Sequence, residues 1–245
     1  MPSYDQPTLA PLDIQKAYRL QLEIAKRAIL HDEFKNIRYV AGVDLAYLRG
    51  NDEGLAVIII LDYPSLTPLE ARFAKGRVKV PYIPGLLAFR EAPLAYTAFT
   101  RLSIRPDLII VDGHGRAHPR KAGIATHIGV ALDTPSIGVA KKRLAGVECK
   151  YGIREALCIG NEVVAVILEH RRRRLYVSPG HRVSLKTAYE LVRNMLKPRA
   201  TLPLPTYIAD KLSKIAKTVP ACLQNDIQHC EEKLLEEAKR IRGKL

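Results

Sequence analysis

The sequence lacks an apolar run long enough to cross a membrane. Its longest uninterrupted apolar stretch covers residues 55–61, whereas a membrane-spanning helix needs about 20 apolar residues. Residues 1–13 also lack the basic segment, apolar stretch and small-residue cleavage site of a secretory signal. We therefore expect a cytoplasmic protein that does not contact a membrane.

Cysteine is scarce, and its spacing does not suggest a metal site or a disulfide framework. Only Cys149, Cys158, Cys222 and Cys230 occur, and no two of them form a CxxC pair. Neither a zinc ribbon nor a disulfide scaffold is therefore indicated. We expect all four to serve as small apolar residues, because free cysteine packs readily in protein cores.

Acidic residues are few relative to basic ones. The chain has 25 Asp and Glu against 39 Lys and Arg, which gives a formal net charge of +14. Such a surplus attracts polyanions, and nucleic acid is the commonest polyanion in the cytoplasm. Anionic membrane surfaces and ribosomal association favour the same sign of charge, so charge alone leaves these alternatives open.

Length and hydrophobic pattern predict one α/β domain. The chain has 245 residues, 47% of them apolar, and shows neither an internal repeat nor a long linker. Apolar runs predict strands at residues 39–47, 54–63, 71–80, 107–112, 136–140, 155–159 and 162–170, with an edge strand at 175–177. Helical spacing predicts helices at residues 13–35, 85–102, 121–132, 184–196 and 205–217, and a peripheral helix within 221–245.

Two substructures are expected within this domain. The first three strands form an antiparallel meander, in which a turn at residues 49–54 joins the first two, and Pro64 and Pro68 interrupt the path to the third. The strands at 107–112 and 136–140 flank a helix, and the handedness of such a unit makes them parallel.

Three acidic residues occupy positions where an acid is costly unless it has a function. Asp44 interrupts an apolar strand, on the same face as Gly42 and Ala46. Asp112 ends a buried parallel strand, at the edge where open α/β sheets bind ligands, and Glu91 lies on the helix between them. Neighbouring carboxylates repel unless a cation neutralises them, and Mg²⁺ prefers oxygen ligands. A metal held by acids in a basic protein indicates phosphodiester hydrolysis.

Two of these acids also have simpler interpretations. Glu91 is compatible with a solvated position on a helix, and Asp112 with a cap or turn at the end of a strand. Asp44 has no comparable explanation because it lies in the middle of a strand.

The residues after Asp112, GHGRAHPRKAG, form a glycine-rich basic turn. Gly113 allows close approach of the backbone, and the start of the next helix favours a phosphate. His118 and, after a later strand, Lys141 are candidates to contact that phosphate. A solvated turn, a histidine bonded to backbone and a surface lysine are the alternatives. We expect residues 171–174, four arginines, to form a solvated turn that adds general attraction for phosphate.

Residues 81–85, PYIPG, form a stiff loop ahead of the helix that carries Glu91. Tyr82 and Ile83 are bracketed by prolines, and Gly85 ends the loop. Side chains of these types insert between base steps and unstack them. The alternative is that Tyr82 packs in the core or against the start of the helix.

Together these segments resemble the successive motifs of the endonuclease V family. The matching segments are GVDLAY around Asp44, PYIPGLLAFRE ending at Glu91, DLIIVDGHGRAHPR around Asp112, THIGVALDTPSIGVAKKRL past Lys141, and VSPGHRVS at 177–184. They occur in order from about residue 40 to residue 210, and the long gapless ones are highly specific. The resemblance implies an α/β fold of the ribonuclease H-like type, with a mixed sheet, an antiparallel meander and flanking helices.

The resemblance also implies a DNA-repair endonuclease that depends on Mg²⁺, with Mn²⁺ able to substitute. Such an enzyme recognises deoxyinosine, the deamination product of adenine, and hydrolyses the second phosphodiester bond on its 3′ side. By position, Asp44, Glu91 and Asp112 would be the metal carboxylates. Asp210, in the segment PTYIADKL, would supply a fourth ligand from a late helix.

Lesion recognition follows from the same resemblance. Tyr82 would stack near the lesion while the flipped base enters a pocket formed largely by backbone, and flipping costs little at a weak pair. His118 and Lys141 would help to position the scissile phosphate and the attacking water. The implied substrate-binding residues are Tyr82, Ile83, Pro84, Gly85, Gly113, His118 and Lys141.

The resemblance implies a single catalytic domain over residues 1–220, including the N-terminal helix, and a helical extension over residues 221–245 that it does not cover. We expect a monomer that binds inosine-containing DNA, with RNA as a further partner. Two alternatives stay open: a ribonuclease H-like nuclease acting mainly on inosine-containing RNA or hybrids, and a non-catalytic nucleic-acid binder. Retention of all three principal carboxylates argues against the binder, because acids facing phosphates do not help binding.

Overall fold

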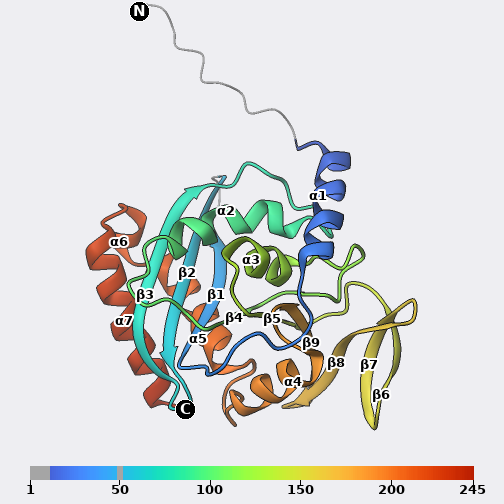
Figure 1. Ribbon diagram of the computed structural model, residues 1–245. Coiled ribbons are helices and arrows are strands. Elements are labelled where there is room, and N and C mark those ends of the chain that lie inside the picture. The colour runs from blue at the N-terminus through green and yellow to red at the C-terminus, as the bar shows by residue number, and fades with distance from the viewer. Residues whose placement is uncertain (1–11, 49–51) are drawn as a thin grey trace, which may run out of the picture.

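A nine-stranded mixed β-sheet forms the centre of the computed structural model, which describes residues 12–48 and 52–245 (Figure 1). The strands are β1 (Tyr39–Tyr47), β2 (Glu53–Asp62), β3 (Thr67–Arg77), β4 (Leu108–Val111), β5 (Ser136–Ala140), β6 (Val147–Tyr151), β7 (Arg154–Ile159), β8 (Glu162–His170) and β9 (Arg173–His181). They lie in the order β3-β2-β1-β4-β5-β9-β8-β7-β6. Strands β1, β4 and β5 run parallel to one another, and the other neighbouring pairs are antiparallel.

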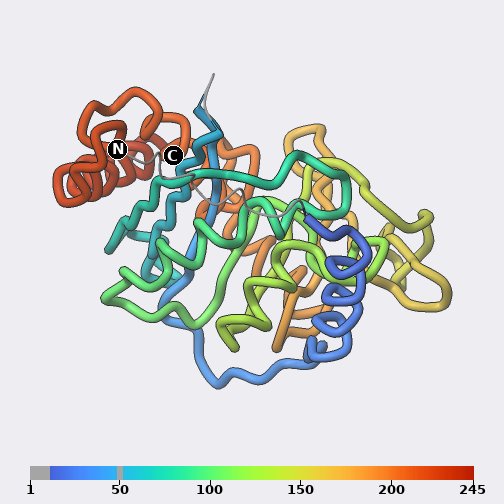
Figure 2. Tube along the Cα trace, turned by 90° about the horizontal axis from the view of Figure 1, so that it is seen from above, coloured from blue at the N-terminus to red at the C-terminus, as the bar shows by residue number. Residues whose placement is uncertain are grey.

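Helices cover both faces of the sheet. They are α1 (Ile14–Arg27), α2 (Leu87–Phe99), α3 (Ile124–Leu132), α4 (Leu185–Asn194), α5 (Leu204–Ala216), α6 (Pro220–Leu223) and α7 (Ile227–Gly243). Successive residues of β1 enter different apolar clusters: Val40 packs with α4, α5 and α7, and Ala41 packs with α2 and α3. Figure 2 shows α1 and the C-terminal helices at opposite ends of the molecule. The predicted α/β class, with its meander and flanking helices, is confirmed.

No helix within residues 12–48 and 52–245 is long and apolar enough to cross a membrane.

The parallel pair β1 and β4 lies in the interior of the sheet, and the carboxyl ends of the two strands position the predicted acids. All four residues of β4 are buried, as expected for a strand covered on both faces. The last aligned pair of the two strands is Val43 opposite Val111. Because each aspartate directly follows one of these residues, Asp44 and Asp112 lie side by side at the same edge.

Two predicted boundaries near the N-terminus are wrong. The helix predicted to reach residue 35 ends at Arg27, because the backbone turns extended at Ala28. The third strand begins at Thr67 and contains Pro68, which lies opposite Leu61 at a register irregularity. Proline is tolerated there because β3 is an edge strand and the ladder is already irregular. The turn predicted at 49–54 includes residues 49–51, which lie outside the described part of the chain.

The prediction of an edge strand at residues 175–177 is also wrong. Those residues belong to β9, a nine-residue strand that lies between β5 and β8. The edge is β6, whose side chains are mostly exposed and so show no apolar pattern. Only half of the predicted arginine turn at 171–174 is a turn: Arg171 and Arg172, with positive φ, join β8 to β9, whereas Arg173 and Arg174 belong to β9. Arg174 forms ion pairs with Glu148 and Glu155.

The C-terminal segment is part of the core rather than peripheral. Helix α7 packs against β3 and α5, and its residues Cys230, Leu234 and Ala238 are fully buried in the same apolar cluster as α5. The amphipathic pattern was correct, but the surface that α7 covers is formed only when the sheet assembles.

The cysteine prediction is wrong, because the four cysteines form two disulfides, Cys149–Cys158 and Cys222–Cys230. The first links the antiparallel neighbours β6 and β7, and the second joins α6 to α7. Their separations of 9 and 8 residues have no diagnostic value in sequence. The pairing follows from a hairpin and a helix turn that bring the sulfurs together.

Candidate active site

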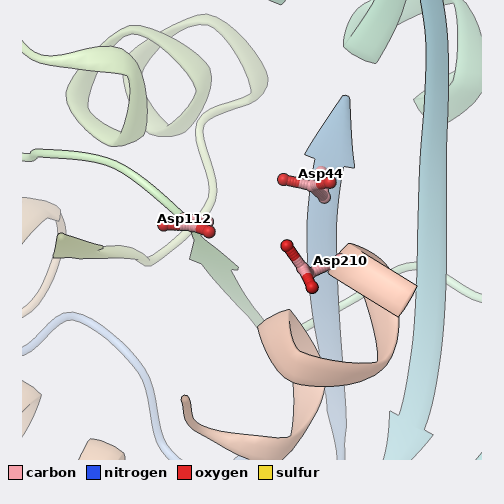
Figure 3. A group of neighbouring side chains, drawn as sticks. All are labelled: Asp44, Asp112 and Asp210. Atoms are coloured by element: carbon pink, nitrogen blue, oxygen red, sulfur yellow. The ribbon is translucent and has the colours of Figure 1, made fainter. Parts of the chain in front are cut away.

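Three aspartates from separate elements meet at the carboxyl ends of β1 and β4 (Figure 3). Asp44 lies near the end of β1, Asp112 directly follows β4, and Asp210 lies on α5. One carboxylate oxygen of each lies within 4.8 Å of those of the other two. The structure therefore brings together three of the four residues predicted to hold a metal.

Helix α5 reaches this edge because β1 has no side chain at the point of contact. A Cβ atom on Gly42 would lie 2.1 Å from the backbone oxygen of Pro205, so only glycine allows this approach. One turn beyond Asp210, the buried hydroxyl of Ser213 donates a hydrogen bond to Asp44 Oδ2 at 2.5 Å. Helix α5 thus supplies one acid of the cluster and orients a second.

Two lysines neutralise part of the negative charge. Lys141 Nζ lies 2.5 Å from Asp112 Oδ2 and 3.9 Å from Asp210 Oδ1. Lys214 Nζ donates to both carboxylate oxygens of Asp210, at 2.7 and 2.6 Å. Although burial opposes its charged form, the neighbouring aspartates raise the pKa of Lys141. Lys141 is therefore cationic beside the cluster, as its predicted role requires.

The negative charge that the lysines leave on the aspartates is suited to a divalent cation. Burial, the largest cause, and the repulsion of Asp112 and Asp210 raise the pKa of Asp44 to about 7, although the hydrogen bond from Ser213 lowers it. Burial also raises the pKa of Asp112, despite the opposing effect of Lys141. Carboxylates held together at this cost, with only oxygen atoms as donors, match the ligands of a hard cation of the magnesium type.

Glu91 lies beside the cluster and is electrostatically coupled to it. Tyr47 donates its hydroxyl hydrogen bond to Glu91 Oε1 at 2.7 Å. Burial, together with the charges of Asp44 and Asp112, raises the pKa of Glu91 to about 7, although the Tyr47 hydrogen bond lowers it. Among the described residues, the group whose oxygens lie within 4.8 Å of one another contains only the three aspartates. Glu91 as a metal ligand stays a prediction.

Metal binding is expected to strengthen between pH 6 and pH 8, because Asp44 and Glu91 lose their protons near pH 7. Their raised pKa values stabilise the metal-free fold below about pH 4, and this stabilisation is lost as pH rises through 7. The increase in melting temperature on adding Mg²⁺ should therefore be larger at pH 8 than at pH 6.

The measurement is thermal unfolding with and without Mg²⁺ at both pH values. In Asp44→Asn, most of the Mg²⁺-dependent increase should disappear. Equal increases at pH 6 and pH 8 in the unsubstituted protein would contradict the assignment.

The loop at residues 81–85 presents Tyr82 to solvent, and 70% of this side chain is exposed. The loop ends at Gly85, whose φ of +80° favours glycine. The structure leaves Tyr82 free to stack on a base and does not place it in the core.

His118 is buried against this loop, and both of its ring nitrogens form hydrogen bonds. Its Nδ1 accepts from the backbone N–H of Arg120 at 3.2 Å, so Nε2 carries the proton and donates to the Gly85 carbonyl at 2.9 Å. Burial lowers the pKa of His118 to about 4, so the ring is neutral. A role at the scissile phosphate stays a prediction, and it requires Nε2 to leave Gly85.

A small cavity lies between the loop at residues 81–85 and the start of α3. It is lined by Gln21, Gly85, Leu87, Ala88, His114, His118, Ala122, Gly123, Ile124 and Leu144. The apolar and glycine residues form its walls, and the polar groups come from Gln21 and the two histidines. The cavity holds about 30 Å³, so a flat group with a few polar edges could enter it only if the walls separate.

Close backbone packing holds the segment that follows Asp112. A Cβ atom on Gly138 would lie 2.4 Å from the Gly115 nitrogen and 2.6 Å from the Gly113 oxygen. These distances explain the glycine at position 138, whereas a Cβ atom on Gly113 itself would lie 2.6 Å from the Ile124 Cγ2 atom of α3. Whether Gly113 also approaches the substrate stays a prediction.

Sequence reasoning missed three residues that contact the predicted site. Ser213 lies three residues after Asp210, so helical periodicity could have placed it on the same face. Tyr47 and Gln21 gave no such signal, because their partners, Glu91 and Gly85, are far from them in sequence.

Comparison with known proteins identifies relatives over most of the chain. The family profile described as Endonuclease V matches residues 22–211. A protein of Ignicoccus hospitalis named endonuclease V is 42% identical over 204 residues, which is 82% of this chain and 94% of that protein. A crystal structure of endonuclease V from Streptomyces avermitilis superposes with a TM-score of 0.78 at 34% identity, covering 86% of this chain and 96% of the other.

A structure with bound nucleic acid is also similar. Endonuclease V of Ciona intestinalis, in complex with a 24-mer DNA containing an inosine followed by a ribo-adenosine, superposes with a TM-score of 0.73 at 27% identity. The superposition covers 82% of this chain and 96% of that one.

Proposed function

Because this chain belongs to the endonuclease V family, we propose that it is a DNA-repair enzyme that recognises deoxyinosine and hydrolyses the second phosphodiester bond 3′ to it. Membership of the family makes the chain an endonuclease, a hydrolase of phosphodiester bonds. The observation that carries the proposed chemistry is the cluster of Asp44, Asp112 and Asp210 at one edge of the sheet. The inosine bound by the Ciona intestinalis relative supports the substrate.

We assign Mg²⁺, with Mn²⁺ as a substitute, as the cation of this enzyme. Asp44, Asp112 and Asp210 would hold it, with Glu91 beside them. A bound divalent cation activates water and stabilises the charge on the leaving oxygen in phosphodiester hydrolysis. Lys141, already cationic next to Asp112, would attract and align the scissile phosphate.

The exposed loop and the neighbouring cavity support lesion recognition. Tyr82, Ile83 and Pro84 would fill the gap left in the duplex, because an aromatic ring replaces the stacking of an extruded base. The extruded hypoxanthine would enter the cavity beside Gly85, where His118 holds the loop in position.

We assign residues 1–220 to the catalytic domain and residues 221–245 to an extension. The end of the family match at residue 211 supports an addition to the catalytic unit. We further propose that the enzyme acts as a monomer in the cytoplasm.

The deciding experiment is cleavage of an end-labelled duplex with one deoxyinosine in the presence of Mg²⁺. We expect one nick in the inosine strand, at the second phosphodiester bond on its 3′ side, and no cleavage of the matched undamaged duplex. Inosine-containing RNA and plain RNA–DNA hybrids belong in the same series. Faster cleavage of either of them, or no nick in any substrate across several temperatures, would overturn the proposal.

A further inference from the structure

Gln21 on α1 is almost completely buried, although glutamine is mostly found on protein surfaces. Its exposed fraction is 1%, and its amide lies at the small cavity described above. Nε2 donates to the carbonyl oxygen of Gly85 at 2.9 Å and lies 3.4 Å from that of Ala122. One side chain therefore joins the two walls of the cavity, the loop at residues 81–85 and the start of α3.

The orientation of this amide is determined by Arg120. Arg120 Nε donates to Gln21 Oε1 at 2.5 Å, so the NH₂ group must face the two carbonyls. The guanidinium in turn lies over the ring of Tyr18, 3.8 Å from its centroid, on the same helix α1. The amide is thus held by a cation that α1 itself helps to position.

The carbonyl of Gly85 receives three donors. They are Gln21 Nε2 at 2.9 Å, His118 Nε2 at 2.9 Å and Arg120 Nη2 at 3.0 Å. A carbonyl oxygen has two lone pairs, so this peptide group is more heavily bonded than any ordinary loop requires. The bonds fix the end of the loop that carries Tyr82 relative to the cavity.

We propose that Gln21 is a positioning residue for lesion recognition, setting the spacing between the Tyr82 loop and the cavity that receives the base. The inference rests on the proposed function and adds a residue to it, since the family match begins only at residue 22. Gln21 does not touch the carboxylates. Its contribution is to the choice of substrate and not to bond cleavage.

Two substitutions separate the contacts of this side chain. Gln21→Glu keeps an acceptor for Arg120, but it directs a second oxygen at the carbonyls of Gly85 and Ala122, so the two walls move apart. Gln21→Met has a similar shape and removes every hydrogen bond. Ala17→Gly is the matched control, because Ala17 is the other buried residue of α1 and glycine weakens the helix without touching the cavity.

The experiment measures the dissociation constants of the full chain and the three variants for a duplex with one deoxyinosine and for the matched undamaged duplex, in EDTA so that no cleavage occurs. Melting temperatures are measured alongside. We expect Gln21→Glu to lower the preference for inosine about tenfold, because a buried oxygen then faces two carbonyl oxygens, and Gln21→Met severalfold, because its hydrogen bonds are lost. Affinity for undamaged DNA should change less than twofold.

The controls distinguish the possible failures. An unchanged preference in both Gln21 variants would overturn the inference, as would an equal loss in Ala17→Gly. If Gln21→Glu does not fold, Gln21→Met decides alone. If the unsubstituted protein itself shows no preference for inosine, the proposed function fails rather than the role of Gln21.

Discussion

Asp44→Asn and Asp112→Asn should each reduce cleavage of the inosine duplex by roughly 1,000-fold or more. The cation contributes several kcal/mol to transition-state stabilisation, and about 4 kcal/mol corresponds to three orders of magnitude in rate. Asparagine keeps the shape of the side chain but removes the negative charge that holds the ion. Single-turnover cleavage rates at saturating enzyme measure this loss directly.

DNA binding by these variants should be retained or strengthened. Each substitution removes a carboxylate that repels the phosphate backbone, while the net positive charge that holds the duplex increases. The control is Asp226→Asn, the same chemical change at the N-cap of α7, where asparagine caps equally well. If Asp112→Asn cleaved at the rate of this control, the aspartate cluster would have no role in the reaction.

Tyr82→Ala should weaken binding to inosine-containing DNA by roughly 5- to 150-fold, since aromatic stacking contributes about 1–3 kcal/mol per base. The structure indicates that this substitution tests DNA binding without disturbing the fold. With 70% of the side chain exposed, Tyr82 contributes little to folding, so the melting temperature should hardly change. Affinity for undamaged DNA, in which no base is extruded, should fall much less.

Ile153→Ala is the matched control for Tyr82→Ala. Ile153 is an apolar side chain with an exposed fraction of 94%, located in the turn between β6 and β7, and its loss should leave the preference for inosine unchanged. Equal losses of affinity for damaged and undamaged DNA in Tyr82→Ala would show that Tyr82 is a general contact and not a wedge.

The predicted acids were found because their positions conflict with local sequence. Asp44 breaks an apolar strand, and Asp112 ends one, so each is unusual without knowledge of its partner. Asp210 came only from the resemblance, yet α5 brings it within 4.8 Å of both. Glu91 lies beside the group rather than within it.

The disulfides and the packing of the C-terminal helix, in contrast to these acids, leave no signal in the local sequence. Cys149 and Cys158 lie on strands that pair only after a hairpin forms, and Cys230 is buried only after α7 packs with β3 and α5. Their separation along the chain carries no information about either event. Free cysteine and disulfide are therefore indistinguishable in this sequence.

The family, the antiparallel meander, the parallel strand–helix–strand unit and the two strand acids are encoded in local sequence, as apolar runs interrupted by charge. Hydrophobic burial acts on each segment in turn, so its pattern survives in the linear chain. Ser213 and Asp44, which are in contact, are separated by 169 positions in the sequence, and Gln21 and Gly85 by 64. Hydrogen bonds depend on distances of a few tenths of an ångström. Only the folded arrangement of α5 on β1, and of α1 beside α3, decides whether such bonds form.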